Sequence, residues 1–440
     1  MVHLIDYMMA DLIEKVRGNV ERTVPPIGGL SAAIALRNAG HTVTVYEKYA
    51  SAFTSTTLPL SNAISTGANI LRIIDRWGFD FARARAGLNL QERIFHGETM
   101  EQLHHIDFKY NRPEFGYDWL LMRRQALHDG LLGIARKTED GQVPIEIFLG
   151  REAVVLDCSA GRLGLEDGEE VISDLVVVAD GVHSKLIDAI TENATPPLQA
   201  GRTAYRFMVP RCAIIADPEL RAVYENEEEG FSYYQIPERN IFFLVTQSDE
   251  GESFYCLLVH PALKTDMDAI DKWSVEGSRA ELRKLTENFH PVVRKLCELA
   301  ATPLLWTICC REPLKSYIKG RAVAIGDAAH THLPHHGQGA AAAAEDAAAL
   351  GIFMSKDVTP DDVPSVLRQW ESLRLPRANA IQYLTINFPK PIQELESKVR
   401  TFYDGPLPEN VDSHETTITR WFYSYDVVAE AIKFCEQMQA

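Results

Sequence analysis

The chain lacks the features that would point to a membrane protein, a nucleic-acid-binding protein or a disulfide-stabilised protein. Its 440 residues contain 44 Lys and Arg against 61 Asp and Glu, a formal net charge of -17. An acidic chain has no basic excess with which to hold phosphate backbones or anionic lipids. The seven cysteines form no CxxC pair, and no stretch approaches the roughly 18 apolar residues of a membrane-spanning helix. The composition therefore predicts a cytoplasmic protein with small-molecule partners, without nucleic acid, membrane or metal.

The most informative part of the sequence is residues 322–350, where several features of a ligand-binding site lie close together. A short apolar strand at residues 322–325 is followed by Asp327, by a loop that contains Gly337 and Gly339, and by an alanine-rich helix. Glycines leave backbone N–H groups accessible, and a helix N-terminus adds a partial positive charge. Asp327 lies where a strand of an α/β fold ends, so it can accept a hydrogen bond from a sugar or ribityl hydroxyl. The segment therefore predicts a ligand-binding strand, loop and helix.

This segment resembles the GD loop of the flavin-dependent aromatic hydroxylases, the single-component monooxygenases typified by salicylate and p-hydroxybenzoate hydroxylases. Their motif is GDAAH, three residues, a proline, two residues, GxG, and an acidic residue in the helix. The matching positions here are Gly326, Asp327, Ala328, Ala329, His330, Pro334, Gly337, Gly339 and Asp346. The resemblance implies an FAD site that includes Asp327, Pro334, Gly337, Gly339 and Ala340.

A second nucleotide-binding element is predicted near the start of the chain. From Gly28 the sequence GGLSAAIALRNAGHTVTVYEK predicts a helix and then a strand at residues 42–46 that ends in Glu47. An acidic side chain at the end of this strand can accept hydrogen bonds from both hydroxyls of an adenosine ribose. Gly28, Gly29 and Glu47 are therefore expected to bind FAD or NAD, and not NADP.

Residues 1–26 do not fit the first half of this unit. The family pattern would place glycines at Val24, Pro26 and Gly29, and only Gly29 is a glycine. Prolines offer no N–H to a pyrophosphate, and residues 14–23 are too charged for the buried central strand of a parallel sheet. Residues 8–16 look more like a short amphipathic helix. Either the first segment has been replaced, which we favour, or the chain has diverged and binds flavin weakly.

Three other stretches resemble parts of the same family that touch the cofactor. A loop that begins at Ala63 resembles the loop beside the flavin ring. A strand-to-helix junction places Arg124 at the flavin phosphate or ribityl chain. A buried strand that ends in Asp180 resembles the DG motif, which contacts the cofactor and has been linked to the pyridine nucleotide, although Ile187 replaces its usual arginine.

The substrate region is expected at residues 191–300, where short alternating runs predict an antiparallel sheet. The clearest predicted strands are residues 231–236, 241–246 and 253–260. Arg206 resembles a family position at which arginine can bind a phenolate or carboxylate, and Tyr233 and Tyr234 are further pocket candidates. The acidic residues 227–229 are predicted to form a solvated turn.

The histidines of the GD loop have different predicted roles. His330 is part of the motif and is expected to be structural. His332, His335 and His336 could line the pocket and act as acid or base near neutral pH. Residues 370–377 resemble the RxxR helix of the family, with Arg374 and Arg377 at its two arginine positions.

The predicted fold is α/β, with a Rossmann-like FAD-binding domain similar to that of p-hydroxybenzoate hydroxylase, an inserted antiparallel-sheet substrate domain and a helical C-terminus. The expected divisions are residues 1–75, 105–190 and 301–385 for the FAD-binding domain, 76–104 and 191–300 for the substrate domain, and 386–440 for the C-terminal helical segment.

The resemblance implies an FAD-dependent monooxygenase that hydroxylates a small aromatic or phenolic substrate with O2 and NADH or NADPH, through a C4a-hydroperoxyflavin. Arg206 and Tyr234 are the candidate catalytic residues. A flavin oxidase or dehydrogenase on the same fold is one alternative. An inactive, flavin-poor binding protein is another, because the first GxG of the fingerprint is lost. Substrate identity, regiochemistry, the choice of nicotinamide and the oligomeric state stay open.

Overall fold

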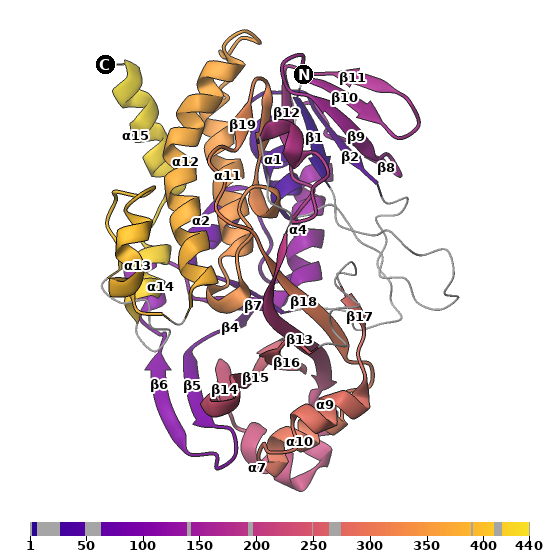
Figure 1. The fold of residues 1–440 in the computed structure, drawn as a ribbon, viewed down its shortest axis with the longest axis vertical. Coiled ribbons are helices and arrows are strands. Elements are labelled where there is room, and N and C mark those ends of the chain that lie inside the picture. Colours follow the sequence, from indigo (N-terminus) through magenta and orange to yellow (C-terminus); the bar gives the residue numbers. More distant parts are fainter. Residues whose placement is uncertain are drawn as a thin grey trace.

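The computed structural model describes residues 2–6, 27–48, 63–138, 142–191, 197–248, 250–263, 274–388, 390–408 and 416–439. Within these residues, a mostly parallel sheet and a larger antiparallel sheet dominate the fold (Figure 1). Helices α11 (Gly339–Phe353), α12 (Val363–Ile386) and α15 (Val427–Gln439) lie beside the parallel sheet, whereas the antiparallel sheet forms the other end of the molecule. The predicted α/β class with a helical C-terminus is confirmed.

The parallel sheet carries the nucleotide-binding elements. From one edge to the other, the described strands are β19 (Ile318–Lys319), β20 (Ala322–Ala324), β12 (Leu175–Val178), β1 (Val2–Asp6), β2 (Val43–Glu47) and β8 (Glu146–Leu149). Only β19 runs antiparallel to its neighbour. Asp180-Gly181 follows β12 and Gly326-Asp327 follows β20, so both motifs lie at the carboxyl edge of the sheet, where α/β folds bind ligands.

The central strand corrects one expectation. Strand β1 pairs in parallel with both β2 and β12, so a first strand is present although none was expected in this part of the chain. Whether residues 7–26 replace the rest of the family's first segment stays a prediction, because they are not described. The strand lies at the very start of the chain and not directly before Gly28. The predicted helix at residues 8–16 and the prolines Pro25 and Pro26 lie outside the described residues.

Helix α1 (Ile27–Asn38) packs closely on the alanine-rich helix α11. Almost every side chain of α11 is buried, because the helix lies between α1, α2 (Ala68–Arg76), α12 and α15. Small residues permit this approach. A Cβ on Gly351 would lie 2.9 Å from the carbonyl oxygen of Ala35, which is closer than packed atoms allow. The alanine run predicted as a helix is therefore also the centre of the nucleotide-side core.

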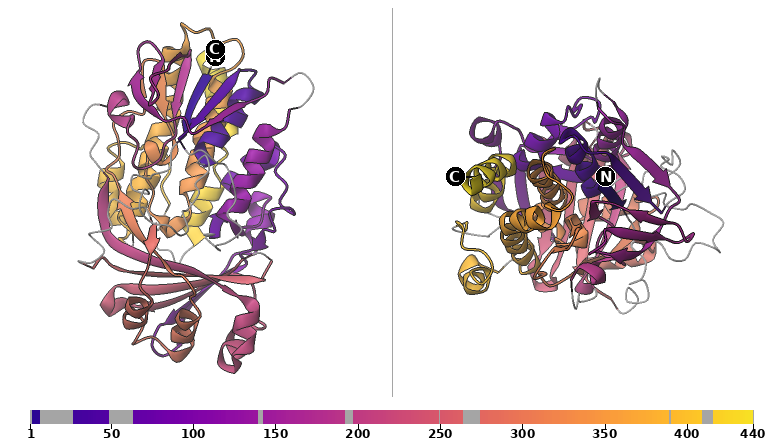
Figure 2. Two further views of the ribbon diagram at one scale, coloured as in Figure 1. Left: turned by 90° about the vertical axis from the view of Figure 1, so that its right-hand side faces the viewer. Right: turned by 90° about the horizontal axis from the view of Figure 1, so that it is seen from above.

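The antiparallel sheet confirms the three predicted strands. The order of its described strands is β17 (Ser274–Glu276), β18 (Leu304–Cys310), β13 (Leu198–Pro210), β16 (Ser253–Pro261), β15 (Ile241–Ser248), β14 (Phe231–Ile236), β5 (Gln91–His96) and β6 (Gln102–Asp107). Helices α7 (Pro218–Tyr224), α9 (Arg279–Leu285) and α10 (Pro291–Glu298) cover its outer face (Figure 2). The opposite, inner face of this sheet is directed toward the parallel sheet and its helices. Strand β18 lies within the range predicted for the FAD-binding domain but pairs into this sheet.

Smaller elements complete the fold. The short strands are β3 (Ala63–Thr66), β4 (Gly87–Leu88), β7 (Leu120–Arg123), β9 (Ala153–Asp157), β10 (Arg162–Leu165) and β11 (Glu170–Ile172). The other helices are α3 (Asn111–Phe115), α4 (Arg124–Arg136), α5 (Ile187–Ile190), α6 (Arg211–Ala216), α13 (Ile392–Val399) and α14 (Thr416–Tyr423). Among the helices that the structure describes, none is long and apolar enough to cross a membrane.

The acidic turn at residues 227–229 is less solvated than predicted. The Glu227 side chain is only 7% exposed and forms an ion pair with Arg93. It also accepts a 2.8 Å hydrogen bond from Oγ of Ser232. Glu229 accepts a 3.0 Å hydrogen bond from the backbone N–H of Leu88. The turn is therefore a structural link between β14 and the region around β5.

Candidate active site

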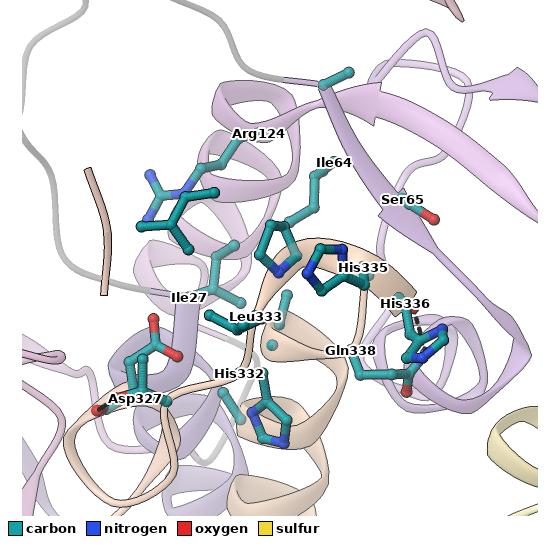
Figure 3. A pocket seen from close by; sticks show the side chains of 18 of the residues that line it. Ile27, Ile64, Ser65, Arg124, Asp327, His332, Leu333, His335, His336 and Gln338 are labelled. Atoms are coloured by element: carbon teal, nitrogen blue, oxygen red, sulfur yellow. Dashed lines mark hydrogen bonds between the residues drawn. The ribbon is translucent and has the colours of Figure 1, made fainter. Parts of the chain in front are cut away.

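A cleft of about 370 Å³ lies between the carboxyl edge of the parallel sheet and the inner face of the antiparallel sheet. Its walls come from the start of α1, the DG turn after β12, the GD loop after β20, the antiparallel sheet and α14. Figure 3 shows how Arg124, Asp327 and the loop histidines lie around it. Segments far apart in the sequence therefore meet at one concave site.

Asp346 of α11 fixes the GD loop through hydrogen bonds to two of its residues. Oδ2 of Asp346 accepts hydrogen bonds from the backbone N–H of Gly326, at 3.1 Å, and from Nε2 of His330, at 2.5 Å. Burial alone would raise the pKa of Asp346, but His330 and Arg374 outweigh it and lower the pKa to about 2. The carboxylate is therefore charged at neutral pH, and His330 has the structural role predicted for it.

The contacts of Asp346 continue into a buried polar network. Nε of Arg374 donates to Oδ1 of Asp346, and its Nη1 donates to Oε2 of Glu345, both at 3.0 Å. Nδ2 of Asn69 donates to Oε1 of Glu345 at 2.9 Å and to Oε1 of Gln338 at 3.0 Å. We call these residues the GD network: Asn69, Gly326, His330, Gln338, Glu345, Asp346 and Arg374. It joins α2, the GD loop, α11 and α12, and of its members only Gly326 and Gln338 line the cleft.

Asp327 is directed toward the cleft. It lines the cleft wall and is accessible to solvent there. Partial burial raises the pKa of its carboxyl group above the ordinary value, while His330 and Arg124 act in the opposite direction. A Cβ added to Gly339 would meet no heavy atom closer than Oδ1 of Asp327, at 3.9 Å. The carboxylate and the start of α11 therefore present an open polar corner.

The start of α11 supplies hydrogen-bond donors to the same corner. Ala342 donates the first hydrogen bond of the helix, to the carbonyl oxygen of Gln338 at 2.8 Å. The N–H groups of the three preceding residues, at positions 339–341, have no acceptor within the helix. Gly339 and Ala340 line the cleft, so their small side chains leave these groups open to an anionic or carbonyl ligand.

The DG turn lies next to the GD loop. Asp180 is 3% exposed, and burial raises the pKa of its carboxyl group to about 7, although the neighbouring Ser184, the Lys185 backbone and Arg311 act in the opposite direction. Arg311, directly after β18, bridges the two turns. Its guanidinium donates to the carbonyl oxygen of Ala328 at 3.3 Å and to that of Val182 at 3.0 Å. Sequence reasoning missed Arg311, and its position after a buried strand was the only available signal.

The antiparallel sheet presents large side chains to the cleft. Arg206 of β13 lines the cleft, is 4% exposed, and lies with its guanidinium carbon 5.4 Å from the centroid of the Trp306 ring. Tyr233 of β14 lines the same wall. The aliphatic and other aromatic residues of this wall are Phe231, Leu244, Tyr255, Leu257 and Ile308. The surroundings of the buried Arg206 are therefore mostly apolar and aromatic.

Tyr234 corrects a prediction. Successive strand residues point to opposite faces, and Tyr234 lies in the core beneath the sheet. Its hydroxyl lies 3.0 Å from that of Tyr224, and its ring stacks on Phe95 with centroids 5.3 Å apart. Tyr234 does not line the cleft, so the structure contradicts a catalytic contact, and Tyr233 is the tyrosine that faces the site.

The loop histidines line the cleft but do not titrate near neutrality. Burial lowers the pKa of His335 to about 3 and of His336 to about 4, and lowers that of His332 well below its ordinary value. His335 stacks on Phe388 with centroids 4.9 Å apart. Burial therefore favours the neutral form of the three rings, which makes general-acid catalysis by a charged imidazolium at neutral pH unfavourable.

The structure brings together most of the residues that the sequence singled out. Those that line the cleft are Gly28, Ala63, Arg124, Asp180, Arg206, Asp327, Pro334, Gly337, Gly339 and Ala340. Gly29 is buried inside α1, and Glu47, 1% exposed, ends β2 outside the cleft. Residues 7–26 and 49–62, which flank these two positions in the sequence, lie outside the described residues.

The C-terminal helix α14 was not expected at the site. Ile418, Thr419, Phe422 and Tyr423 line the cleft. A Cβ on Gly67 would overlap the Tyr423 ring, so the loop beside α2 and α14 are in direct contact. Arg377 anchors this helix, since it donates to the carbonyl oxygen of Trp421 at 3.3 Å and lies over its ring at 4.4 Å. Only the tertiary fold places this C-terminal segment at the cleft.

These features define a protein that binds a flavin nucleotide beside a substrate-covering sheet. Asp327, the N–H groups that begin α11, and the guanidinium of Arg124 are suited to ribityl, pyrimidine and phosphate groups. Residues 27–385 match the family described as "FAD binding domain".

Known proteins agree with this match. The FAD-dependent monooxygenase cfoG of Aspergillus candidus is 29% identical over 365 residues, which cover 82% of this chain and 82% of the relative. Hispidin-3-hydroxylase of Neonothopanus nambi is 28% identical over 368 residues, covering 81% and 84%. A salicylate hydroxylase solved as a substrate complex has a TM-score of 0.71 at 20% identity, covering 98% and 97%. The chain belongs to this FAD-binding family and is an FAD-dependent monooxygenase.

Proposed function

We propose that this monooxygenase hydroxylates a small aromatic, phenolic compound with O2 and with NADH or NADPH as electron donor. The observation that carries the proposal is Arg206, a buried cation in a largely apolar and aromatic wall that faces the GD loop. A guanidinium at this position stabilises a phenolate or carboxylate. An ionised phenol has a more nucleophilic ring carbon, so the same contact would favour hydroxylation. The name of hispidin-3-hydroxylase supports an aromatic substrate.

The residues of the nucleotide side would hold FAD, which supplies the redox chemistry with O2 when it is bound. In this proposal the N–H groups at residues 339–341 and Asp327 bind the isoalloxazine and ribityl end. Arg124 and Asp180 lie along the middle of the cofactor, and Ala63 lies beside the ring. Gly28 and Gly29 begin the helix at the pyrophosphate, and Glu47 binds the adenosine ribose. Pro334 and Gly337 keep the loop close to the ring.

The substrate side would exclude water and orient the ring. Tyr255 has a pKa raised to about 12, mainly by burial, so its hydroxyl stays protonated and can donate to a phenolate oxygen. Neutral His335 and His336 close the wall near the GD loop without adding charge. A dry, largely uncharged site protects a reactive oxygen species from unproductive loss.

The test is reconstitution with FAD followed by NADH or NADPH oxidation across a panel of phenolic acids. We expect at least one phenol to stimulate oxidation and to gain one oxygen atom, measured by mass spectrometry. In Arg206→Gln the KM for that phenol should rise by about tenfold or more, with FAD content unchanged. Turnover in the complete absence of NADH and NADPH would instead indicate an oxidase or dehydrogenase. Purified protein that takes up no FAD would indicate an inactive binding protein.

We further infer that the protein works in the cytoplasm. All seven cysteines lie in described residues and are free thiols, which suits a reducing compartment. Fluorescence microscopy of a tagged protein, with a cytosolic marker as reference, tests this location.

A further inference from the structure

A second charged side chain lies in the antiparallel-sheet wall of the cleft, far from Arg206. Glu92 is the second residue of β5, is 7% exposed, and lines the cleft. Strand β5 is four strand positions from β13 in the sheet order, so the backbones of Glu92 and Arg206 are about 19 Å apart. The proposed function uses Arg206 and gives no role to this carboxylate.

Strand alternation explains why Glu92 faces the cleft. Its neighbour Arg93 points to the opposite face, where it forms an ion pair with Glu227 and lies near Tyr234. Glu92 is in parallel register with Phe231 of β14, so the two side chains share the cleft face. The carboxylate is therefore placed at the cleft by the register of the strand.

A cluster of aromatic rings lines the same cleft and includes Phe231 and Tyr233, the two rings next to Glu92. Phe231 has its ring centroid 5.7 Å from that of Trp119 and 6.0 Å from that of Tyr233. Trp119 also lies 5.5 Å from Tyr423 and 4.5 Å from Phe108, measured between centroids. All of these rings line the cleft. We call Glu92, Phe108, Trp119, Phe231, Tyr233 and Tyr423 the aromatic box.

The chemistry of the aromatic box favours a cation. A buried carboxylate attracts positive charge strongly because little water screens it, and the faces of aromatic rings attract cations within about 6 Å of their centroids. Burial, and secondly the charge of Glu92, raise the pKa of Tyr233 well above its ordinary value. The negative potential of Glu92 therefore reaches the cleft-facing wall, where a bound molecule would meet it.

We propose that the aromatic box binds a protonated amine carried by the aromatic substrate, with Glu92 as its counter-ion. The proposal rests on the proposed function, since it specifies the substrate class of the same cleft. Arg206 would bind the acidic group of the substrate and the aromatic box its basic nitrogen. The substrate is then an amine-bearing phenol or aromatic acid, held in one orientation by opposite charges at its two ends.

The test compares two phenols that differ only in charge. Tyramine carries an ammonium group where para-propylphenol carries a methyl group. Dissociation constants are measured with the FAD-loaded enzyme from the change in flavin fluorescence, which needs no turnover. We expect tyramine to bind the wild type about tenfold more tightly than para-propylphenol. In Glu92→Gln this preference should disappear, with para-propylphenol binding unchanged. Equal binding of the two phenols to the wild type, or an undiminished preference in Glu92→Gln, overturns the proposal.

Two further variants distinguish the loss of the Glu92 charge from a general disturbance of the fold. Glu92→Asp keeps the charge and should keep most of the preference. Glu146→Gln removes an exposed glutamate from β8 of the other sheet and should leave both dissociation constants unchanged. Circular dichroism and FAD content confirm folding of each variant. If no phenol stimulates NADH or NADPH oxidation but the amine preference depends on Glu92, the proposed function fails and the aromatic box stands. If the enzyme hydroxylates a phenol but shows no preference for the amine, the proposed function stands and the aromatic-box proposal fails.

Discussion

The nucleotide wall of the cleft presents backbone groups and small residues, whereas the antiparallel-sheet wall presents large aromatic and charged side chains. The nucleotide wall is supported by the GD network, in which Arg374, Glu345 and Asp346 are all almost fully buried. On the sheet wall, Arg206 lies over Trp306 and Glu92 lies among aromatic rings. A cofactor common to a family needs a fixed backbone geometry, while a substrate is distinguished by side chains that can change without altering the fold.

This comparison predicts that the largest effect comes from breaking the GD network. In Arg374→Ala two buried carboxylates lose their cation, so the free energy of unfolding should fall by about 3–5 kcal/mol and FAD should be lost. Urea denaturation and flavin absorbance measure both effects. The control is Arg400→Ala, which removes an exposed pair with Glu396 and should change the stability by less than about 0.5 kcal/mol. An Arg374→Ala variant that is stable and retains FAD would show that the network does not support the loop.

The next largest effect concerns pH and Asp180. The pKa of this carboxyl group rises from 3.8 in a solvated chain to about 7 in the fold. Between these values the folded protein holds a proton that the unfolded chain has released, so stability falls as pH rises from about 4 to about 7. Asp180→Asn removes this contribution. Urea midpoints of the FAD-free protein at several pH values should therefore show a shallower decline for Asp180→Asn. Identical pH dependence in the two proteins would contradict a raised pKa.

A smaller effect is expected from a residue that faces the cofactor without belonging to the GD network. In Asp327→Ala the hydrogen bond to the ribityl chain is lost, and the dissociation constant for FAD should rise by roughly tenfold or more. Stability without FAD should change little, because Asp327 is exposed in the cleft. Asp361→Ala, at a side chain that is 99% exposed, is the matched control. Normal FAD retention in Asp327→Ala would count against the proposed contact.

The smallest effect separates the two faces of the antiparallel sheet. Tyr234→Phe removes the hydrogen bond to Tyr224 and should lower the free energy of unfolding by about 1 kcal/mol, with KM unchanged. Tyr233→Phe alters the cleft wall and should change KM by a few fold, with little loss of stability. Steady-state kinetics and urea denaturation of both variants provide the comparison. A KM effect confined to Tyr234→Phe would reverse the assignment of faces.

The GD and DG motifs and the strands at residues 231–260 could be predicted from the sequence because each depends on local spacing. The GD motif, for example, is one short continuous segment. It consists of a strand followed by Gly-Asp, a loop with glycines at fixed positions and an alanine-rich helix. The structural role of His330 was predictable for the same reason. The first strand was missed because Val2–Asp6 lies far in sequence from the helix that it precedes in the fold.

Sequence alone determined the family and the α/β class and led to the residues proposed to bind the flavin, since these follow from motifs that the chain carries in continuous stretches. Only the tertiary structure decided which of Tyr233 and Tyr234 faces the cleft, because a shift of one residue moves a strand side chain to the other face. It also decided that Arg311 bridges two turns, that Glu92 lies among aromatic rings, and that α14 closes the site. Those contacts join residues separated by long stretches of chain, and burial by distant segments also sets the pKa values of the loop histidines.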